Sequence, residues 1–471
     1  MVEIIDFAIA AAPFVVAGVA LLWLGWSALW AGVAALAAAV AGAVARLDAS
    51  GLGEAFLEGF GTSWGVLYVL FGGLLLYNFL SAGGAVGEVS RFLGEIEPDK
   101  EALALGVVIG AAPFFESVTG FGVAVVISAP ILLAAGFSPI KAAALSTWGQ
   151  CAVPWGALGV GTVIGADLSG LTFGRLSDWS AVLNLPLFVV YAIATLALAG
   201  GWSGVRRHGI EAVFLGLVAG FGTLATSLYL VPELSGAVGG LLAAGAFLAV
   251  RWRRVARVPG KALLPYGILL ALITLISGPE AVNSFLQDLD PVLGSVLTGP
   301  GLPLLLSAAF AAATLGLETE TVKSSALSTL RQWAPTAGAV LTFVLAGQVV
   351  ASSGAAAILA SSAVATGVLY PAAASVVGAL GGVLTGSNAA SNALFMPLQI
   401  EAAGGLGVSE PLTAGVQNVS GSHASMLAPQ RVILAATATG LLGREGEIVR
   451  AALPPVVVSV FVVGAVGLLA G

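Results

Sequence analysis

Residues 102–135 read ALALGVVIGAAPFFESVTGFGVAVVISAPILLAA, which is two apolar arms on either side of a polar, glycine-containing tip at 113–122. Each arm has about 11–13 residues and would form roughly 17–20 Å of helix at 1.5 Å per residue. That length reaches only the middle of a bilayer whose hydrocarbon core is about 30 Å thick. We therefore expect a re-entrant helical hairpin with its polar tip at the membrane midplane.

A second segment follows the same pattern. Residues 371–403 read PAAASVVGALGGVLTGSNAASNALFMPLQIEAA, with a polar tip at 385–392, and a further break follows each hairpin, at 149–156 and at 418–425. A shift of 271 positions superimposes Ser117 on Asn388, Gly136 on Gly407, Ser138 on Ser409 and Thr147 on Asn418. Two copies of a hairpin and a broken helix are typical of transporters built from inverted repeats.

The composition is that of an integral membrane protein. Of the 471 residues, 58% are hydrophobic and only 9% are charged, whereas soluble domains carry about 25% charged residues. The apolar stretches are continuous and do not alternate, which argues against an outer-membrane barrel. The N-terminus has no basic region, so we expect its first apolar segment to be a retained span in the cell membrane.

We expect an all-α polytopic membrane protein with about 10–14 crossings. The candidate spans are 7–25, 27–45, 63–83, 183–201, 210–227, 233–250, 262–278, 301–317, 335–351 and 452–470. The expected organisation is an N-terminal helical pair at 1–47, repeat 1 at 48–205 with hairpin 102–135 and broken helix 139–165, linking helices at 206–300, and repeat 2 at 301–471 with hairpin 371–403 and broken helix 411–442.

Residues between these spans give further expectations. Residues 84–101 should form an interfacial amphipathic helix, and the charges between 317 and 335 should form a polar connection. Arg206 and Arg207 precede a two-span hairpin and five more cations follow it at 251–261, so both clusters should lie on the cytoplasmic side.

The polar tips predict an anion-binding site. A helix that begins at the midplane has unpartnered N–H groups and a positive dipole end, which suit a carboxylate. Glycines would allow close approach to the backbone, although each polar or small residue alone could equally serve helix packing. The candidate substrate-binding residues are Ser117, Thr119, Gly120, Phe121, Gly122, Gln150, Trp155, Gly386, Ser387, Asn388, Ser391, Asn392, Asn418 and Ser422.

Two residues could carry a coupling proton. Glu116 is an ionisable group within a span, which is a functional candidate by default, and burial favours the neutral form of a carboxyl group. Its alternative role is to cap the neighbouring half-helix or to pair with a cation. His423 is the second candidate, or else a buried neutral imidazole. Arg431 could offset the charge of the substrate, lie near a membrane interface or pair with an acid.

Other classes of protein find less support in the sequence. Cys151 is the single cysteine, the chain has only two histidines, and no nucleotide-binding loop is present. We therefore expect no enzyme activity, no metal or cofactor, and no nucleic-acid partner. Two alternatives remain, namely an anion channel and a sodium-coupled carboxylate symporter with Asn388 or Asn392 as ion ligands.

Several motifs resemble those of the lactate permease family of bacteria and archaea, from about residue 60 to the C-terminus. They are FESVTGFG at 115–122, GFSP at 136–139, PWGALG at 154–159, TGSNAASNALF at 385–395 and MLAPQ at 426–430. The resemblance implies proton-coupled symport of L-lactate or glycolate, and kinship with the ion transporter superfamily, whose members are often homodimers with a mobile transport domain and a fixed scaffold. Family members carry a Lys where this chain has Ser425. If that Lys holds the substrate, either His423 or Arg431 takes over its role or the substrate differs.

Overall fold

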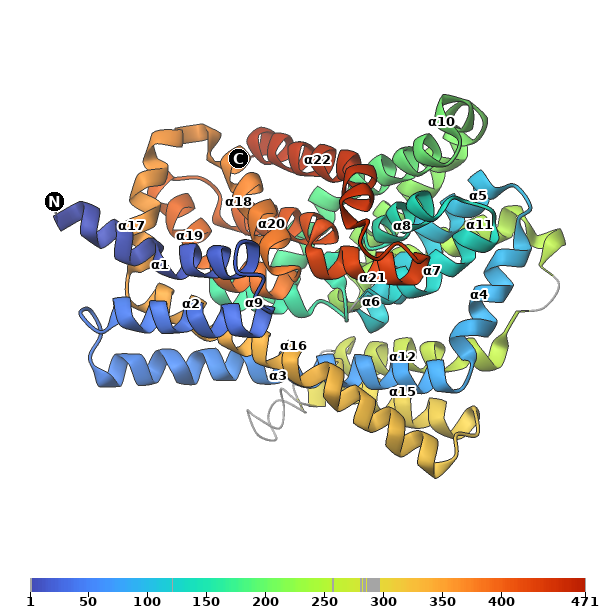
Figure 1. Cartoon of the computed structure of the whole chain (residues 1–471), viewed down its shortest axis with the longest axis horizontal. Helices are drawn as coiled ribbons and strands as arrows, with labels where there is room; N and C mark the ends of the chain where they lie inside the picture. Colours follow the sequence, from blue (N-terminus) through green and yellow to red (C-terminus); the bar gives the residue numbers. More distant parts are fainter. Residues whose placement is uncertain are drawn as a thin grey trace.

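The computed structural model describes residues 2–120, 122–255, 258–279 and 297–470, together with Val282 and Phe285. Every regular element in these residues is a helix, as the sequence predicts (Figure 1). Nine of the described helical segments are long and apolar enough to cross a membrane. The chain is therefore a multi-pass membrane protein.

One of these segments supplies two crossings. α10 (Phe173–Tyr229) reverses at Gly201, whose φ of 64° and ψ of −156° are not helical. Its two arms pack against each other through Gly216 against Val189 and Gly220 against Leu185. With both arms counted, the described part of the chain has ten candidate crossings (9 + 1), at the lower end of the predicted range.

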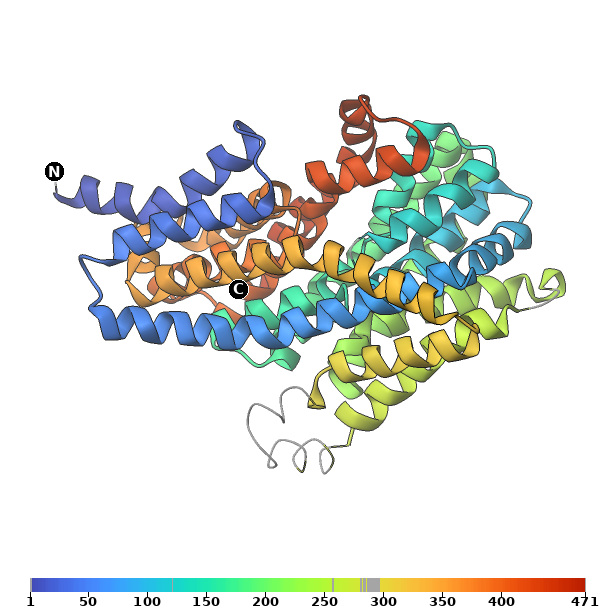
Figure 2. The ribbon, with the colours of Figure 1, turned by 60° about the horizontal axis from the view of Figure 1, so that its bottom comes forward.

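Long helices form a layer along one side of the molecule, which we call the scaffold layer (Figures 1 and 2). Its two longest members lie side by side, and shorter helices flank them. Close approach rests on small residues, such as Gly59 against Leu345. The helices are α1 (Val2–Leu22), α2 (Ala28–Ala43), α3 (Ala49–Ala82), α12 (Gly260–Ser277), α15 (Gly301–Thr314) and α16 (Thr319–Ser352). The predicted polar connection at 317–335 is wrong, because α16 continues through most of it as a helix with exposed charges.

Two helical hairpins lie against this layer. The first runs through α5 (Lys100–Leu105), the π-helix η1 (Gly106–Ala111) and α6 (Ala112–Thr119), and returns as α7 (Val123–Ala134). The second pairs α18 (Tyr370–Thr385) with α19 (Asn388–Leu406). Both chain reversals occur within the predicted polar tips. The predicted length of the first arm is wrong, because helix continues through most of the tip and the arm has 20 residues, from Lys100 to Thr119.

A broken helix follows each hairpin. The first consists of α8 (Pro139–Trp148), a 3-10 turn (Val153–Trp155) and α9 (Val160–Ser169), and its break agrees with the prediction. The second consists of α20 (Glu410–Ala424), a 3-10 turn (Ser425–Leu427) and α21 (Pro429–Thr439). The predicted break at 418–425 is wrong, because the chain stays helical to Ala424. The break comes just before Pro429, which drives Ala428 into an extended conformation with ψ of 145°.

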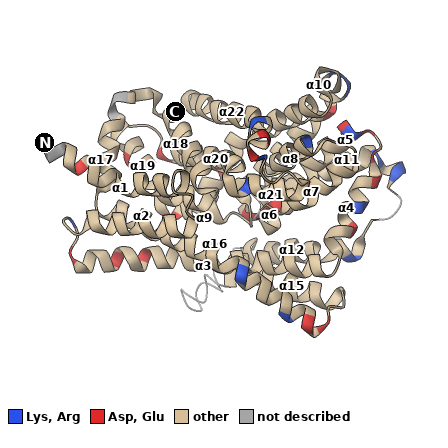
Figure 3. Ribbon diagram, in the orientation of Figure 1, with Lys and Arg blue, Asp and Glu red and all other residues tan. Residues whose placement is uncertain are grey.

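The remaining helices connect or cover these units. α4 (Ala85–Ile96) is the helix predicted at 84–101, and the others are α11 (Ser235–Val250), α17 (Ala355–Ser361), η5 (Ser362–Leu369) and α22 (Glu445–Ala470). Arg251 of one predicted basic cluster pairs with Glu211, close to Arg206 and Arg207 of the other. The two clusters therefore lie at the same end of the molecule, toward α5, α10 and α11 (Figure 3).

Candidate functional site

A cavity of about 340 Å³ lies between the two hairpin tips and the scaffold layer. The hairpins and broken helices form one wall, through Glu116, Gly120, Val153, Gly156, Ala157, Val160, Gly161, Thr385, Gly386, Ser387, Asn388, Ala389, Ala390, Gln430, Arg431 and Leu434. The scaffold layer and the turn before α2 form the other, through Ser27, Ala28, Leu29, Leu70, Pro335, Thr336, Ala339 and Val340. Both predicted tips thus contribute to one cavity.

The first tip is fixed to the first helix break by backbone contacts. The N–H of Leu158 donates to the carbonyl of Ser117 at 2.6 Å, and the N–H of Ala157 donates to that of Glu116 at 3.2 Å. Gly120 permits this approach, because its φ is +66° and a Cβ there would lie 2.8 Å from the Cβ of Ala157.

The second tip is docked on the second break in the same manner. Gly386 also has a φ of +66°, and a Cβ there would lie 2.5 Å from Oε1 of Gln430 and 3.1 Å from Cβ of Ala428. Each tip therefore lies against the break that follows it in the chain, and residues from both tips and both breaks line the one cavity.

An ion pair joins the two halves inside the cavity. Nη1 of Arg431 lies 3.2 Å from Oε1 of Glu116 and also donates to Oε1 of Gln150, while Nε donates to the carbonyl of Gly386 at 3.2 Å. The Arg431 side chain is 15% exposed and that of Glu116 is 1% exposed. Among the described residues that line the cavity, these two are the only ionisable ones, so the ionised pair leaves the cavity neutral.

Glu116 also caps a half-helix. Its two carboxylate oxygens accept the N–H groups of Gly122 and Ala124, each at 3.3 Å, at the start of α7. Both structural roles considered from the sequence, capping and pairing, are therefore present. The start of α7 is occupied by this carboxylate, whereas α19 begins at the cavity with Ser387, Asn388 and Ala389 in its lining.

A cluster of amides lies behind the second tip. The Nδ2 groups of Asn388 and Asn392 both donate to Oδ1 of Asn418 at 2.8 Å, and Asn418 in turn donates to Thr162 and Ser180. The Oδ1 atoms of Asn388 and Asn392 are buried and accept no hydrogen bond in the described part of the chain. Of these two residues, Asn388 lines the cavity and Asn392 does not.

The structure separates the predicted substrate-binding residues into three groups. Gly120, Gly386, Ser387 and Asn388 line the cavity, and Gly122, Gln150, Asn392 and Asn418 contact lining residues directly. The remaining described ones are buried outside the lining, namely Ser117, Thr119, Trp155, Ser391 and Ser422. Phe121 lies outside the described residues.

His423 is buried in a neutral hydrogen-bond network away from the cavity lining. Its Nε2 lies 2.5 Å from Oδ1 of Asn184 and its Nδ1 lies 3.1 Å from the hydroxyl of Tyr191. Asn184 donates to the carbonyl of Cys151 at 3.2 Å, which orients its Oδ1 toward the imidazole. The network favours the tautomer that is protonated on Nε2, and it supports the first helix break beside Gln150.

The sequence left the role of Arg431 open, and the structure shows one of the alternatives, pairing with an acid, which is Glu116. A signal was present, because Arg431 is the only Lys or Arg between residues 332 and 443. Burying a lone cation in such a long apolar region is energetically costly, so the residue is a functional candidate by default.

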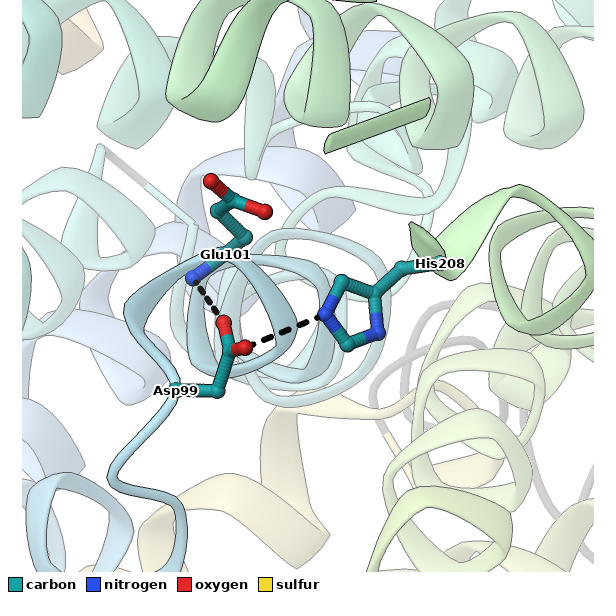
Figure 4. A group of neighbouring side chains, drawn as sticks. All are labelled: Asp99, Glu101 and His208. Atoms are coloured by element: carbon teal, nitrogen blue, oxygen red, sulfur yellow. Dashed lines mark hydrogen bonds and ion pairs between the residues drawn. The ribbon is translucent and has the colours of Figure 1, made fainter. Parts of the chain in front are cut away.

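A second group of ionisable side chains, Asp99, Glu101 and His208, is shown in Figure 4. It lies at the end of the molecule that holds the two basic clusters, which we call the charged end, where α5 begins and α10 passes. Asp99 accepts the N–H of Glu101 at 2.9 Å and lies 3.2 Å from Nε2 of His208. The ligand atoms of these three residues lie within 4.8 Å of one another. Arg207 lies 3.5 Å from both carboxylates, so a guanidinium already supplies the positive charge that a metal ion would bring.

The same network continues to Glu97, just after α4. Its carboxylate lies 2.5 Å from Nε of Arg251 and 2.7 Å from Nη1 of Arg254. Burial alone would raise the pKa of Glu97, but the N–H of Asp99 and the two guanidinium groups outweigh it, and the pKa lies below its ordinary value. The network ties the start of the first hairpin to α10 and α11.

A polytopic helical protein with hairpin tips and broken helices around one charged cavity belongs to the class of membrane transporters. The chain belongs to the L-lactate permease family, whose model matches residues 6–294 and 293–470. The resemblance noted in the motifs is thereby confirmed, and the family comprises permeases rather than enzymes.

Three relatives and one solved structure each align with most of this chain. The chain is 29% identical to the L-lactate permease of Streptococcus iniae over 389 residues, which cover 76% of this chain and 81% of that protein. It is 25% identical to the L-lactate permease of Escherichia coli K12 (82% and 81% covered) and 25% identical to the glycolate permease GlcA of the same strain (88% and 86%). It also aligns with the crystal structure of the Alcanivorax borkumensis YdaH transporter, with a TM-score of 0.45, 19% identity, and 90% and 89% of the two chains covered.

Proposed function

We propose that this chain is a proton-coupled symporter of L-lactate or a related short 2-hydroxymonocarboxylate such as glycolate. The substrates named for its relatives suggest the class of substrate. The observation that carries the proposal is the Glu116–Arg431 pair, which lies in an otherwise uncharged cavity between two helix tips.

The substrate's functional groups find complementary partners in the cavity. Its carboxylate would bind Arg431 and the N-terminal end of α19, where the helix dipole favours an anion. Its 2-hydroxyl would donate to the free Oδ1 of Asn388. Its methyl group would contact the apolar scaffold wall at Leu70 and Val340.

The net charge of the cavity gives a reason why substrate binding would be coupled to a proton. The ionised Glu116–Arg431 pair is neutral, so a bound carboxylate would leave the cavity with one uncompensated negative charge. An unpaired charge at a buried site costs several kcal/mol. A proton on Glu116 restores neutrality and at the same time frees Arg431 for the substrate. Proton and carboxylate therefore bind together, at one proton per substrate.

We assign the coupling proton to Glu116 and not to His423. Glu116 lines the cavity and contacts Arg431. His423 lies outside the lining, among the neutral side chains of Asn184 and Tyr191. His423 would then be a positioning residue that supports the first helix break.

Transport would follow from movement of the hairpins and broken helices as one domain against the scaffold layer, within two inverted repeats. The cavity lies at the boundary between these two parts, so their relative displacement would expose it to each side in turn. A homodimer held together by the scaffold layers would suit such movement.

Sodium coupling is the second candidate. The unpartnered Oδ1 atoms of Asn388 and Asn392 are oxygen ligands of the kind that a sodium ion prefers. Sodium would balance the substrate's charge without a proton on Glu116. An anion channel needs neither ion, and it would not accumulate substrate.

Proteoliposome uptake separates these candidates. Radiolabelled L-lactate is offered with an inward proton gradient in sodium-free choline buffer, and in parallel with a sodium gradient at equal pH. We expect accumulation above equilibrium with the proton gradient alone. Accumulation that requires sodium would replace the proton in the proposal, and equilibration without accumulation would indicate a channel.

A further inference from the structure

A second cavity, of about 620 Å³, lies between α4 and the base of the first hairpin. One wall is the face of α4 that carries Gly87, Arg91 and Glu95, and the other includes Leu103 of α5 and Ile131 of α7. The cavity therefore touches both arms of the hairpin whose tip holds Glu116.

The inner wall of this cavity is apolar. Leu103 and Ile131 are buried within the protein, and Pro130, Ala134 and Ala135 of the hairpin also line it. A Cβ at Gly94 would lie 3.9 Å from Cγ2 of Ile131, so the helix approaches the hairpin closely on one side of the cavity. An apolar wall of this kind can contact the acyl chain of a lipid.

The rim carries one unpaired cation and one unpaired anion. Arg91 and Glu95 lie one helical turn apart on α4, both exposed. Neither makes a hydrogen bond or ion pair with any described residue. The third charged residue of the wall, Glu97, is already paired with Arg251 and Arg254.

The position of α4 places this rim at the membrane surface. The helix connects two candidate spans, Ala49–Ala82 and Lys100–Thr119. It lies toward the charged end of the molecule (Figure 3). Amphipathic helices of this kind lie in the headgroup region of the bilayer.

We propose that this cavity binds one zwitterionic phospholipid with a primary ammonium headgroup, as in phosphatidylethanolamine. Its phosphate pairs with Arg91, its ammonium group donates to Glu95, and the upper part of an acyl chain contacts Leu103 and Ile131. The trimethylammonium group of phosphatidylcholine has no N–H to donate, and phosphatidylglycerol offers Glu95 no cation. The bound lipid joins α4 to both arms of the first hairpin and so stabilises the hairpin's base.

The test measures lipid binding directly and needs no assumption about the transported substrate. Purified protein in dodecyl maltoside is titrated with phosphatidylethanolamine, phosphatidylcholine or phosphatidylglycerol, and its melting temperature and lipid adducts in native mass spectra are recorded. We expect phosphatidylethanolamine to give the largest rise in melting temperature and a predominant single adduct. Arg91→Ala and Glu95→Gln should each weaken its apparent affinity by about tenfold, the loss of one charge-assisted hydrogen bond.

Glu88→Gln is the matched control, because Glu88 is an exposed acid on α4 that does not line the cavity. This variant should retain the wild-type preference. Equal stabilisation by the three lipids, a preference for phosphatidylglycerol, or a preference that survives in both rim variants would overturn the proposal. Arg91→Gln replaces Arg91→Ala if the latter is not monodisperse on size exclusion.

Discussion

Replacing Arg431 by alanine should remove most of the affinity for the carboxylate substrate. The change deletes the only described cation that lines the cavity, together with its contacts to Glu116 at 3.2 Å and to the carbonyl of Gly386 at 3.2 Å. A hydrogen bond to a charged group contributes about 1.5–3 kcal/mol. The dissociation constant for L-lactate should therefore rise by roughly 10- to 150-fold.

The same substitution should also lower stability, because Glu116 would keep only two backbone N–H groups at 3.3 Å. Breaking a buried pair on one side costs about 3–5 kcal/mol, which would appear as a lower melting temperature. Arg431→Lys keeps the charge but cannot reach all three partners of the guanidinium, so its affinity should be intermediate.

Isothermal titration of purified protein with L-lactate measures the effect. Arg444→Ala is the matched control, since Arg444 is an exposed arginine that pairs with Glu447 one turn away, and its affinity should equal that of wild type. A folded Arg431→Ala protein with a dissociation constant within twofold of wild type would refute the role assigned to Arg431.

Three further substitutions, one of them a control, test the tip geometry and the charge network. Gly386→Ala should reduce uptake at least tenfold, because a Cβ would lie 2.5 Å from Oε1 of Gln430. Gly407→Ala, with a similar φ of +68° but open space around it, should cost only about 1–2 kcal/mol of backbone strain and retain uptake. Glu97→Gln should lower stability at neutral pH by about 1–3 kcal/mol through its lost pairing with Arg251. Because the pKa of Glu97 is lowered in the folded protein, the extra stability of wild type over Glu97→Gln should be complete above about pH 4.3 and should disappear as the pH falls further. The test compares the melting temperatures of the two proteins from pH 7 to pH 3.5. A difference that stays constant over this range would contradict the prediction.

The positions of the two chain reversals and of the first helix break could be predicted because polar and glycine residues interrupt the apolar segments there. The lengths of the arms could not, because helix continues through most of the first polar tip, to Thr119. The second break could not be located in this way. Ser and Asn residues can remain helical when neighbouring elements accept their hydrogen bonds, as Thr162 and Ser180 do for Asn418. The sequence likewise shows the charges at the start of α16, but not that the helix runs through them.

The candidate site was only partly predictable for a similar reason. Glu116 is identifiable as an acid within an apolar hairpin, but its partner Arg431 lies 315 positions away in the sequence. The scaffold wall carries no local signal, because Leu70 and Val340 are apolar residues like those that face lipid. Only the tertiary arrangement distinguishes a residue that faces the cavity from one that faces the bilayer.

The most direct test of the central claim is proton-driven L-lactate uptake into proteoliposomes by wild type and by Glu116→Gln. A glutamine keeps the size of the side chain but cannot exchange a proton, so Arg431 stays free for the substrate. We predict that the variant loses accumulation under an inward proton gradient and retains lactate counterflow at equal pH. Accumulation by Glu116→Gln at the wild-type level would show that the proton is carried elsewhere and would contradict the account.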